Sequence, residues 1–349
     1  MNFASNDYLG LGSCRELREK VARNFEKYGT SSSSSRLVSG NYTLINKAEK
    51  EYASFFGYDD ALFFPSGYQA NLGVLSTLFE KGDVILFDKH IHGSSVKGMT
   101  MSGAGFHGYK HNSMSHLEKK LEADRHRRVA VVTESLFSMD GDFLDVEGFR
   151  RLKERYGFLS VVDEAHAFGA VGESGRGVCR EAADVAVGTF GKALGLFGAF
   201  ALLPRGVKEY LFNFSSPLIY TTTLPEAHGA SAMDLLEIVS RSDDRRERLK
   251  EVSGIMKENL IKSGFEVGGE AHILAPEIGE EKMAVEISRK MLDRGIFVLP
   301  ARYPTVPLGK AILRISMTSL HTGDDAAYFV DSLAAVHGRK KTGRRRAEG

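Results

Sequence analysis

LSVVDEAH, residues 159–166, is a short, mainly apolar segment that leads directly into three ionisable side chains. VAVVTE at 129–134 has the same form, and the segment at 145–156 between them has the periodicity of a helix. Apolar strands that alternate with helices are typical of a mostly parallel sheet covered by helices. The pattern therefore predicts an α/β fold.

Further apolar segments enlarge the predicted sheet: ALFF (61–64), VILF (84–87), VAVGTF (185–190) and AFALL (199–203). A helix before the first of them is indicated by one apolar face, formed by Ile45, Ala48, Tyr52 and Phe55. In open α/β sheets, ligands bind outside the carboxyl ends of the strands. We expect the functional site among the polar side chains that follow the predicted strands, which are Ser66, Glu134, Ser138, Asp163, His166, Thr189 and Lys192.

A second, smaller α/β domain is predicted in the C-terminal part. A helix-rich segment at 226–262 leads to two strand candidates, IFVLP (296–300) and AILRISM (311–317), and to a last helix near 324–337. The predicted organisation has four parts: an N-terminal segment that contributes to the site (1–40), a large cofactor-binding domain (41–238), a small C-terminal domain (239–338) and a basic, disordered tail (339–349).

The composition limits the expected partners and location. With 46 basic and 45 acidic residues the net charge is +1, so neither nucleic acid nor a membrane is an expected partner. Cys14 and Cys179 lack CxxC spacing, which argues against a disulfide framework and a thiolate metal site. No apolar run is long enough to span a membrane, and MNFASNDYLG lacks the features of a signal peptide. We therefore expect a cytoplasmic protein.

Lys192 lies in GTFGKALGLFGAF (188–200), where four glycines and mostly apolar residues surround it. A phosphate-binding P-loop requires Ser or Thr after its Gly-Lys pair, and residue 193 is Ala. A zinc hydrolase is a second interpretation, with candidate ligands His90, His92, Asp163 and His166. It gives the lysine no clear role. A Schiff base is the third, because an apolar pocket disfavours the ammonium and leaves a nucleophilic amine.

Pyridoxal 5'-phosphate (PLP) is an aldehyde cofactor that such an amine would bind. It needs an acid at its pyridine nitrogen, which Asp163 could supply, and a donor to its phenolic oxygen, which His166 could supply. It also needs a flat group against its ring and donors for its phosphate. PSGYQAN (65–71) offers free amides where a strand turns into a helix. Each signal alone is also compatible with a structural residue.

Six motifs occur in order along nearly the whole chain: SNDYLGL (5–11), SGYQAN (66–71), TESLFSMDGD (133–142), VVDEAHAFGAVGESGRG (161–177), GTFGKALG (188–195) and IYTTTLP (219–225). Together they resemble the α-oxoamine synthases, a family of fold-type-I PLP enzymes. The resemblance implies a mostly parallel sheet covered by helices plus a smaller C-terminal α/β domain. RYPTVPLGKAILRISMTSLHT (302–322) is most similar to the branch that joins L-alanine to a pimeloyl thioester, of CoA or of an acyl carrier protein, in biotin biosynthesis.

The resemblance implies a role for each candidate residue. Lys192 would form the Schiff base with PLP and later remove and return the substrate Cα proton, and His92 would stack on the pyridine ring. The other cofactor contacts would come from Gly67, Tyr68 and Thr189 to the phosphate, Thr221 to the phosphate of the second subunit of a homodimer, Ser138 and His166 to the ring oxygen, and Asp163 to the ring nitrogen. Arg314 would bind the amino-acid carboxylate, Asn6 and Thr305 would contact the substrate, and no metal is implied.

The implied reaction is a decarboxylative condensation that releases CoA, carbon dioxide and an amino ketone. Alternatives within the family are glycine C-acetyltransferase, serine palmitoyltransferase and 5-aminolevulinate synthase; a PLP aminotransferase is a more distant one. Relatives usually carry a further segment before NFASNDYLGL, which begins at residue 2 here, and favour GSGGSR where this chain has SSSSSR (31–36). The serine segment is compatible with a flexible linker or with a hydroxyl-lined loop near the site, so we expect it to influence substrate preference.

Overall fold

The computed structural model describes residues 1–338, in which the chain forms two compact units. The larger unit consists of Gly10–Phe137 and Phe143–Asp243, and the smaller one of Met1–Leu9, Ser138–Asp142 and the chain from Asp244 onward. Each unit is built around a sheet of its own. The predicted basic tail at 339–349 lies outside the described residues.

The larger unit contains a seven-stranded sheet with the order β1-β7-β6-β5-β4-β2-β3. Its strands are β1 (Asp60–Phe64), β2 (Val84–Asp88), β3 (Gly105–Tyr109), β4 (Val129–Glu134), β5 (Leu159–Asp163), β6 (Val185–Thr189) and β7 (Ala199–Leu203). β7 runs antiparallel to both of its neighbours, β1 and β6, and the other pairs are parallel. The predicted α/β class with a mostly parallel sheet is confirmed.

β3 is the strand of this sheet that the sequence pattern does not predict. Its sequence, GFHGY, contains two glycines and a histidine, and its first three residues are exposed. β3 is an edge strand beside β2. It therefore lacks the continuous apolar run by which a strand covered on both faces is found.

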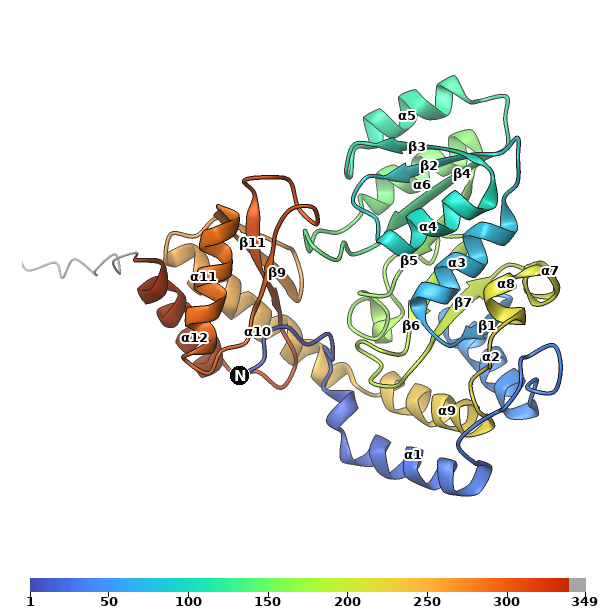
Figure 1. The fold of residues 1–349 in the computed structure, drawn as a ribbon, viewed down its shortest axis with the longest axis horizontal. Helices are drawn as coiled ribbons and strands as arrows, with labels where there is room; N and C mark the ends of the chain where they lie inside the picture. The colour runs from blue at the N-terminus through green and yellow to red at the C-terminus, as the bar shows by residue number, and fades with distance from the viewer. Residues whose placement is uncertain (339–349) are drawn as a thin grey trace, which may run out of the picture. The chain divides into compact units, whose positions relative to one another are not determined.

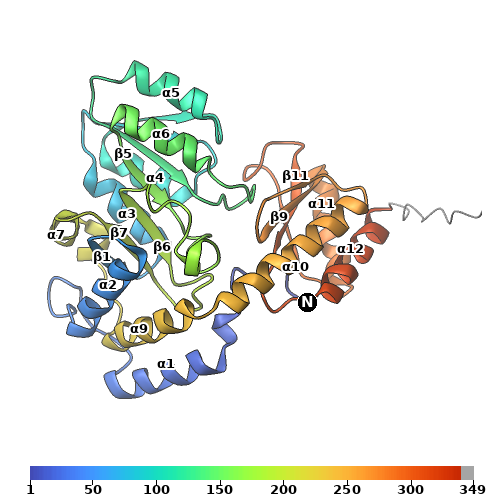
Figure 2. The same cartoon turned by 180° about the vertical axis from the view of Figure 1, so that it is seen from behind.

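Helices cover both faces of the large sheet. The helices of the larger unit are η1 (Leu11–Ser13), α1 (Arg15–Tyr28), α2 (Thr43–Phe56), α3 (Gly67–Leu78), α4 (Gly93–Ser102), α5 (Met114–Ala123), α6 (Val146–Tyr156), η2 (Glu173–Gly175), α7 (Val207–Phe214), α8 (Ser216–Ile219) and α9 (Glu226–Ser240). α3 and α4 lie on the face turned to the viewer in Figure 1, and α6 lies on the opposite face, which Figure 2 shows. In α2, the predicted face is correct except that Phe56 rather than Phe55 is buried.

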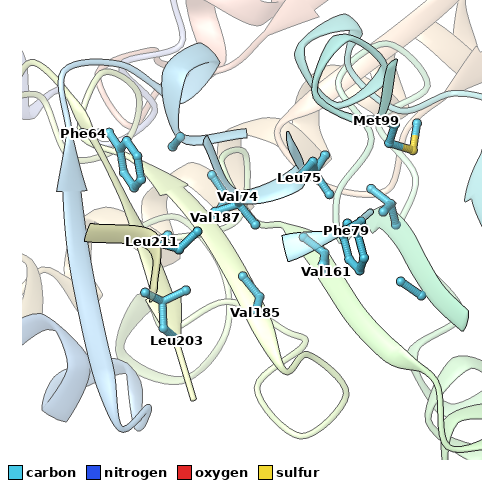
Figure 3. Close-up of a cluster of buried hydrophobic side chains, with 14 of the residues drawn as sticks. Phe64, Val74, Leu75, Phe79, Met99, Val161, Val185, Val187, Leu203 and Leu211 are labelled. Carbon is cyan, nitrogen blue, oxygen red and sulfur yellow. The ribbon is translucent and has the colours of Figure 1, made fainter. Parts of the chain in front are cut away.

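A buried apolar cluster fixes α3 and α4 against the sheet (Figure 3). Phe64 of β1, Val74 and Leu75 of α3, Met99 of α4 and Val187 of β6 belong to it and are at most 1% exposed. Burial of such a side chain contributes roughly 1.5–3 kcal/mol. Because α3 follows β1 and α4 follows β2, the cluster holds the first turns of both helices at the carboxyl edge of the sheet.

The smaller unit contains an antiparallel sheet with the order β10-β11-β9-β8. Its elements are α10 (Asp243–Lys262), β8 (Val267–Gly268), β9 (Ile273–Gly279), α11 (Glu281–Leu292), β10 (Leu299–Ala301), β11 (Ala311–Ser316) and α12 (Gly323–His337). The predicted strand at 296–300 is wrong in its bounds, because only Leu299–Ala301 pairs with β11. None of the helices within residues 1–338 is long and apolar enough to cross a membrane.

The N-terminal segment Met1–Leu9 is part of the smaller unit because its backbone bonds to that unit's strands. Phe3 N donates to Phe297 O at 2.8 Å, and Ser316 N donates to Phe3 O at 2.8 Å. The segment thus brings Asn6 beside the end of β11, where Arg314 lies.

Candidate active site

The polar side chains of the larger unit gather where the parallel strands end. Glu134 of β4 is in register with Asp163 of β5, and Asp163 is in register with Val187 of β6. Thr189 closes β6, and the turn that follows it carries Lys192. Because parallel strands point their carboxyl ends the same way, these groups share one edge of the sheet, as the sequence pattern predicts.

The turn between β6 and β7 places Lys192 against His166. Lys192 Nζ lies 2.7 Å from His166 Nε2, and the histidine is only 7% exposed. Gly195 allows this turn, because its φ is +67° and a Cβ there would lie 2.5 Å from Gly12 N. The lysine is half-buried, and an imidazole nitrogen lies at hydrogen-bond distance from its amine. The imidazole is thus placed to share a proton with the Lys192 amine.

Asp163 is held by donors at both carboxylate oxygens. Ala165 N donates to Oδ1 at 2.9 Å, and Asn71 Nδ2 donates to Oδ2 at 2.8 Å. The carboxyl group is thus held in one orientation, and a carboxylate is the partner that a pyridinium nitrogen requires. Asn71 was not among the predicted site residues. Its position in SGYQAN, one helical turn after Gly67, was the available signal.

His92 has its ring exposed and its backbone fixed. It is the N-cap of α4, where its Nδ1 accepts from Ser94 N at 3.2 Å and lies 2.7 Å from Ser94 Oγ. Its backbone N–H donates to Glu134 Oε1 at 2.6 Å. The ring is therefore held in one orientation at the same edge of the sheet as Asp163, and its free face can take a flat ligand.

The first turn of α3 lies beside Thr189 and Thr221. We call the amides of Gly67 and Tyr68 together with these two threonines the anion cradle. The N–H groups of Gly67 and Tyr68 precede the first helical hydrogen bond, in which Ala70 N donates to Ser66 O at 2.9 Å. A Cβ placed on Gly67 would lie 3.9 Å from Thr189 Cβ, so the two residues are adjacent. The two orphan amides, the positive end of the helix dipole and the hydroxyl suit a phosphate group.

Thr221 is part of this cradle within the same chain, since Gln69 Nε2 donates to its Oγ1 at 3.4 Å. The serine segment supports the neighbouring residues: Ser32 Oγ donates to Thr223 O at 2.8 Å, and Thr223 N donates to Ser34 O at 2.9 Å. These bonds rule out a free linker at SSSSSR. The predicted contact of Thr221 with a second subunit stays a prediction.

The other predicted residues lie in the smaller unit, where three of them form a group. Arg314 of β11 is 5% exposed; its Nε donates to Ser138 O at 2.6 Å and its Nη1 to Asn6 Oδ1 at 3.4 Å. Nη1 also donates to Ser316 Oγ at 2.6 Å. Thr305 is exposed in the loop before β11 and is not part of this hydrogen-bonded group.

Tyr8 is a member of the Arg314 group that sequence reasoning missed. Its hydroxyl donates to Asn6 Oδ1 at 3.0 Å, and burial raises the pKa of Tyr8 to about 12 although Arg314 opposes the shift. The phenol thus stays neutral and serves as a donor. SNDYLGL contains Tyr8, but no pattern within that motif indicates its contact with a strand some three hundred residues away.

The zinc interpretation is not supported by the geometry. His90 stacks on His111 with a ring-centroid distance of 4.1 Å, whereas His92 caps α4. Within residues 1–338, no cluster of metal-compatible side chains includes His92, Asp163 or His166. The two histidines of the HIH motif therefore point to different neighbours, because adjacent positions after β2 belong to a turn and a helix cap.

The chain matches known proteins over nearly its whole length. The model of the family described as aminotransferase class I and II matches residues 1–333. A Bacillus cereus (strain ATCC 10987 / NRS 248) protein provisionally named 8-amino-7-oxononanoate synthase is 38% identical, over 96% of this chain and 87% of the relative.

Two solved structures are similar in fold and in sequence. Serine palmitoyltransferase from S. paucimobilis, with PLP and myriocin bound, has a TM-score of 0.92 and 28% identity over 96% of this chain and 87% of that chain. 8-Amino-7-oxononanoate synthase from Francisella tularensis has a TM-score of 0.84 and 30% identity over 96% of this chain and 97% of that chain. The chain therefore belongs to the aminotransferase class I and II family and, within it, to the α-oxoamine synthases, which are transferases with PLP as cofactor.

Proposed function

We propose that the chain condenses L-alanine with a pimeloyl thioester, releasing carbon dioxide and the thiol and giving 8-amino-7-oxononanoate for biotin biosynthesis. These substrates are supported by its similarity to relatives named 8-amino-7-oxononanoate synthase. The observation that carries the chemistry is the 2.7 Å approach of Lys192 Nζ to His166 Nε2 at the strand ends that also present Asp163.

The residues at this edge fit PLP. The amides of Gly67 and Tyr68 with the Thr189 hydroxyl suit the phosphate, and Asp163, with two donors to its carboxylate, suits a protonated pyridine nitrogen. The His92 ring would cover one face of the cofactor, and Lys192 would bind its aldehyde carbon. When bound, PLP supplies an electron sink that stabilises negative charge at the substrate Cα.

Lys192 then serves as the base at the Cα. A half-buried amine next to an imidazole can take up the Cα proton and return it, a role typically worth about 10²–10⁴-fold in rate. His166 keeps the amine in place through the Nε2 contact and donates to the phenolic oxygen when Lys192 moves away. Ser138 is proposed as a second donor to that oxygen.

Arg314 is proposed to bind the carboxylate of L-alanine. Its Nε donates to Ser138 O, and its Nη1 donates to Ser316 Oγ and to Asn6 Oδ1. The bond to Asn6 is the longest of the three at 3.4 Å, so a substrate carboxylate would replace it and pair with Nη1 and Nη2. Asn6 and Tyr8 hold this orientation from one side. Thr305, in its exposed loop, is proposed to contact the acyl substrate.

A homodimer is part of the proposal, because large apolar side chains are exposed before β7, at the end of α7 and after α8. Phe197 is 70% exposed, Tyr220 is 85% exposed and Phe214 is 64% exposed. Exposed aromatic groups on neighbouring segments are typical of an interface. A second copy would cover them and place its Thr221 at the phosphate. A cytoplasmic location fits the two free thiols, Cys14 and Cys179.

A substrate panel that measures thiol release tests the proposal. We expect release from pimeloyl-CoA or the pimeloyl carrier protein with L-alanine, well above acetyl-CoA with glycine and palmitoyl-CoA with L-serine. A preference for either of the other pairs would move the assignment to another member of the family. Amino transfer to a keto acid with no thiol release would contradict the condensation itself.

A further inference from the structure

A chain of three hydrogen bonds links Asp163 to His92 through two buried side chains. Asn71 Nδ2 donates to Asp163 Oδ2 at 2.8 Å and to Ser94 Oγ at 3.0 Å, and Ser94 Oγ lies 2.7 Å from His92 Nδ1. Asn71 is 3% exposed and Ser94 is 1% exposed. The two linking residues come from different helices, α3 and α4.

The direction of each bond follows from the chemistry of the groups. An ionised Asp163 only accepts, so the Asn71 amide must point its NH2 group toward it, and the second proton goes to Ser94 Oγ. Ser94 Oγ thus accepts, and its own proton goes to His92 Nδ1, which also accepts from Ser94 N at 3.2 Å. A ring whose Nδ1 accepts carries its proton on Nε2 and is neutral.

Close packing of α3 on α4 holds the two linking side chains together. A Cβ on Gly98 of α4 would lie 2.9 Å from Asn71 O and 2.9 Å from Leu75 Cβ, so glycine is required for the helices to approach this closely. Glu134 of β4 is a charged side chain in contact with His92. Its Oε1 accepts from the backbone N–H of His92.

We propose that Asn71 is a positioning residue that couples the two groups on which PLP depends: it fixes the Asp163 carboxylate and, through Ser94, the tautomer and orientation of the His92 ring. The proposal rests on the proposed function in placing Asp163 at the pyridine nitrogen and His92 on the ring face. An asparagine that merely fills a buried polar position would contribute to stability alone and leave His92 and the cofactor unaffected.

Two variants separate the links, and one is a matched control. Asn71→Asp keeps the side-chain volume but sets a second carboxylate against Asp163, so one of the pair must take up a proton. Ser94→Ala removes only the link to His92 and keeps the Asn71–Asp163 bond. Ser95→Ala is the control, because Ser95 is 2% exposed in the same turn of α4 and is outside the chain of bonds.

The first measurement is PLP affinity, read from cofactor absorbance between pH 6 and 9. In Asn71→Asp the dissociation constant should rise about tenfold to a hundredfold near pH 8, since a bond to a charged group is replaced by repulsion, and should recover as the pH falls. Ser95→Ala should match the unaltered protein. Equal PLP affinity in Asn71→Asp and the unaltered protein across this range would overturn the proposal.

The second measurement is the His92 tautomer, from spectra of 15N-histidine-labelled protein assigned with His92→Gln. The unaltered protein and Ser95→Ala should show Nε2–H alone. Ser94→Ala should show a mixture, because it loses the 2.7 Å contact of Oγ and keeps only the longer bond from Ser94 N to Nδ1. Retention of pure Nε2–H in Ser94→Ala would overturn the coupling. Neither measurement uses an acyl thioester. A wrong substrate assignment therefore leaves both results standing, and a failed coupling leaves the substrate panel unaffected.

Discussion

Arg36 and Arg314 are both buried, yet their partners differ. Arg36 is 2% exposed and donates from Nη1 to Glu49 Oε1 at 2.6 Å and from Nη2 to Glu49 Oε2 at 3.2 Å. Arg314, 5% exposed, donates to a backbone carbonyl, a hydroxyl and an amide oxygen. The charge of Arg36 is neutralised by a carboxylate of the fold, whereas we propose that the charge of Arg314 binds the carboxylate of a substrate.

Two lysines of the larger unit, Lys208 and Lys192, also differ in their partners. Lys208 Nζ lies 2.9 Å from Glu49 Oε2, whereas Lys192 Nζ lies 2.7 Å from an imidazole nitrogen. Burial alone would raise the pKa of Glu49, but Arg36 and Lys208 outweigh it and hold the pKa below its ordinary value. We therefore propose that Arg36 and Lys208 stabilise the fold through Glu49, and that Arg314 and Lys192 serve the chemistry.

Replacement of Lys192 should give the largest effect. Lys192→Ala removes the base and the amine that binds the cofactor, so we expect thiol release to fall at least about 10²–10⁴-fold. The melting temperature should stay within a few degrees, since Lys192 is only half-buried. Lys208→Ala is the matched control, with turnover retained and stability lowered; residual turnover above a tenth in Lys192→Ala would break the comparison.

Replacement of Glu49 should be the most destabilising of these changes. Glu49→Gln leaves Arg36 buried without its carboxylate, which we expect to cost about 3–5 kcal/mol in the free energy of unfolding. Glu51→Gln in the same helix is the control, because its pair with Lys47 spans 3.8 Å between side chains 41% and 63% exposed and is worth about 0–1 kcal/mol. Urea unfolding of both variants measures the difference. Equal losses would show that burial does not distinguish the two pairs.

His228 is a third kind of buried group, one held neutral. Burial lowers its pKa from 6.5 to about 4, and it lies beside Phe190 with ring centroids 5.2 Å apart. The unfolded chain therefore binds a proton between pH 6.5 and 4 that the folded chain does not. Stability from this group is complete above pH 6.5 and is lost as the pH falls, by roughly 3 kcal/mol at pH 4.

Urea unfolding across pH 4–8 tests this expectation. His228→Phe removes the titrating group and keeps an aromatic ring, so its free energy of unfolding should depend less on pH below 6.5 than that of the unaltered protein. Parallel pH profiles for the two proteins would contradict the assignment of the acid sensitivity to His228.

Replacement of Arg314 should give the smallest of these effects. Arg314→Lys keeps the charge but loses the fork that binds a carboxylate with two bonds, so KM for L-alanine should rise about tenfold to a hundredfold. KM for the thioester should change less, because we propose that residues other than Arg314 contact the acyl chain. Initial rates with each substrate varied in turn measure the split. An unchanged KM for L-alanine would place the carboxylate elsewhere.

Much of the sheet and its polar edge could be predicted from the sequence. Apolar strands covered on both faces are visible as short runs, and Asp163 and Lys192 directly follow two of them. β9 was missed because Pro276 and Gly279 interrupt its pattern. Asn71 was missed for another reason: its bond to Ser94 joins two helices, and no periodicity within either helix reports it.

The ion pair of Arg36 with Glu49 was beyond reach for the same reason. Arg36 follows five serines that are compatible with a linker, and only the folded chain brings it to α2 and to Phe63 N, which donates to Glu49 Oε1 at 2.8 Å. The sequence pattern therefore predicts residues whose position depends on a single helix or strand. Residues whose role depends on contacts between elements need the structure.

Reduction with borohydride is the most direct test of the claim that Lys192 is the lysine that binds PLP covalently. The holoenzyme is treated with borohydride, digested, and the modified peptide is identified by mass spectrometry. We predict a pyridoxyl group on Lys192 in GTFGKALG, with Lys208 unmodified. A pyridoxyl group on any other lysine, or none on a protein that has bound PLP, would contradict the account.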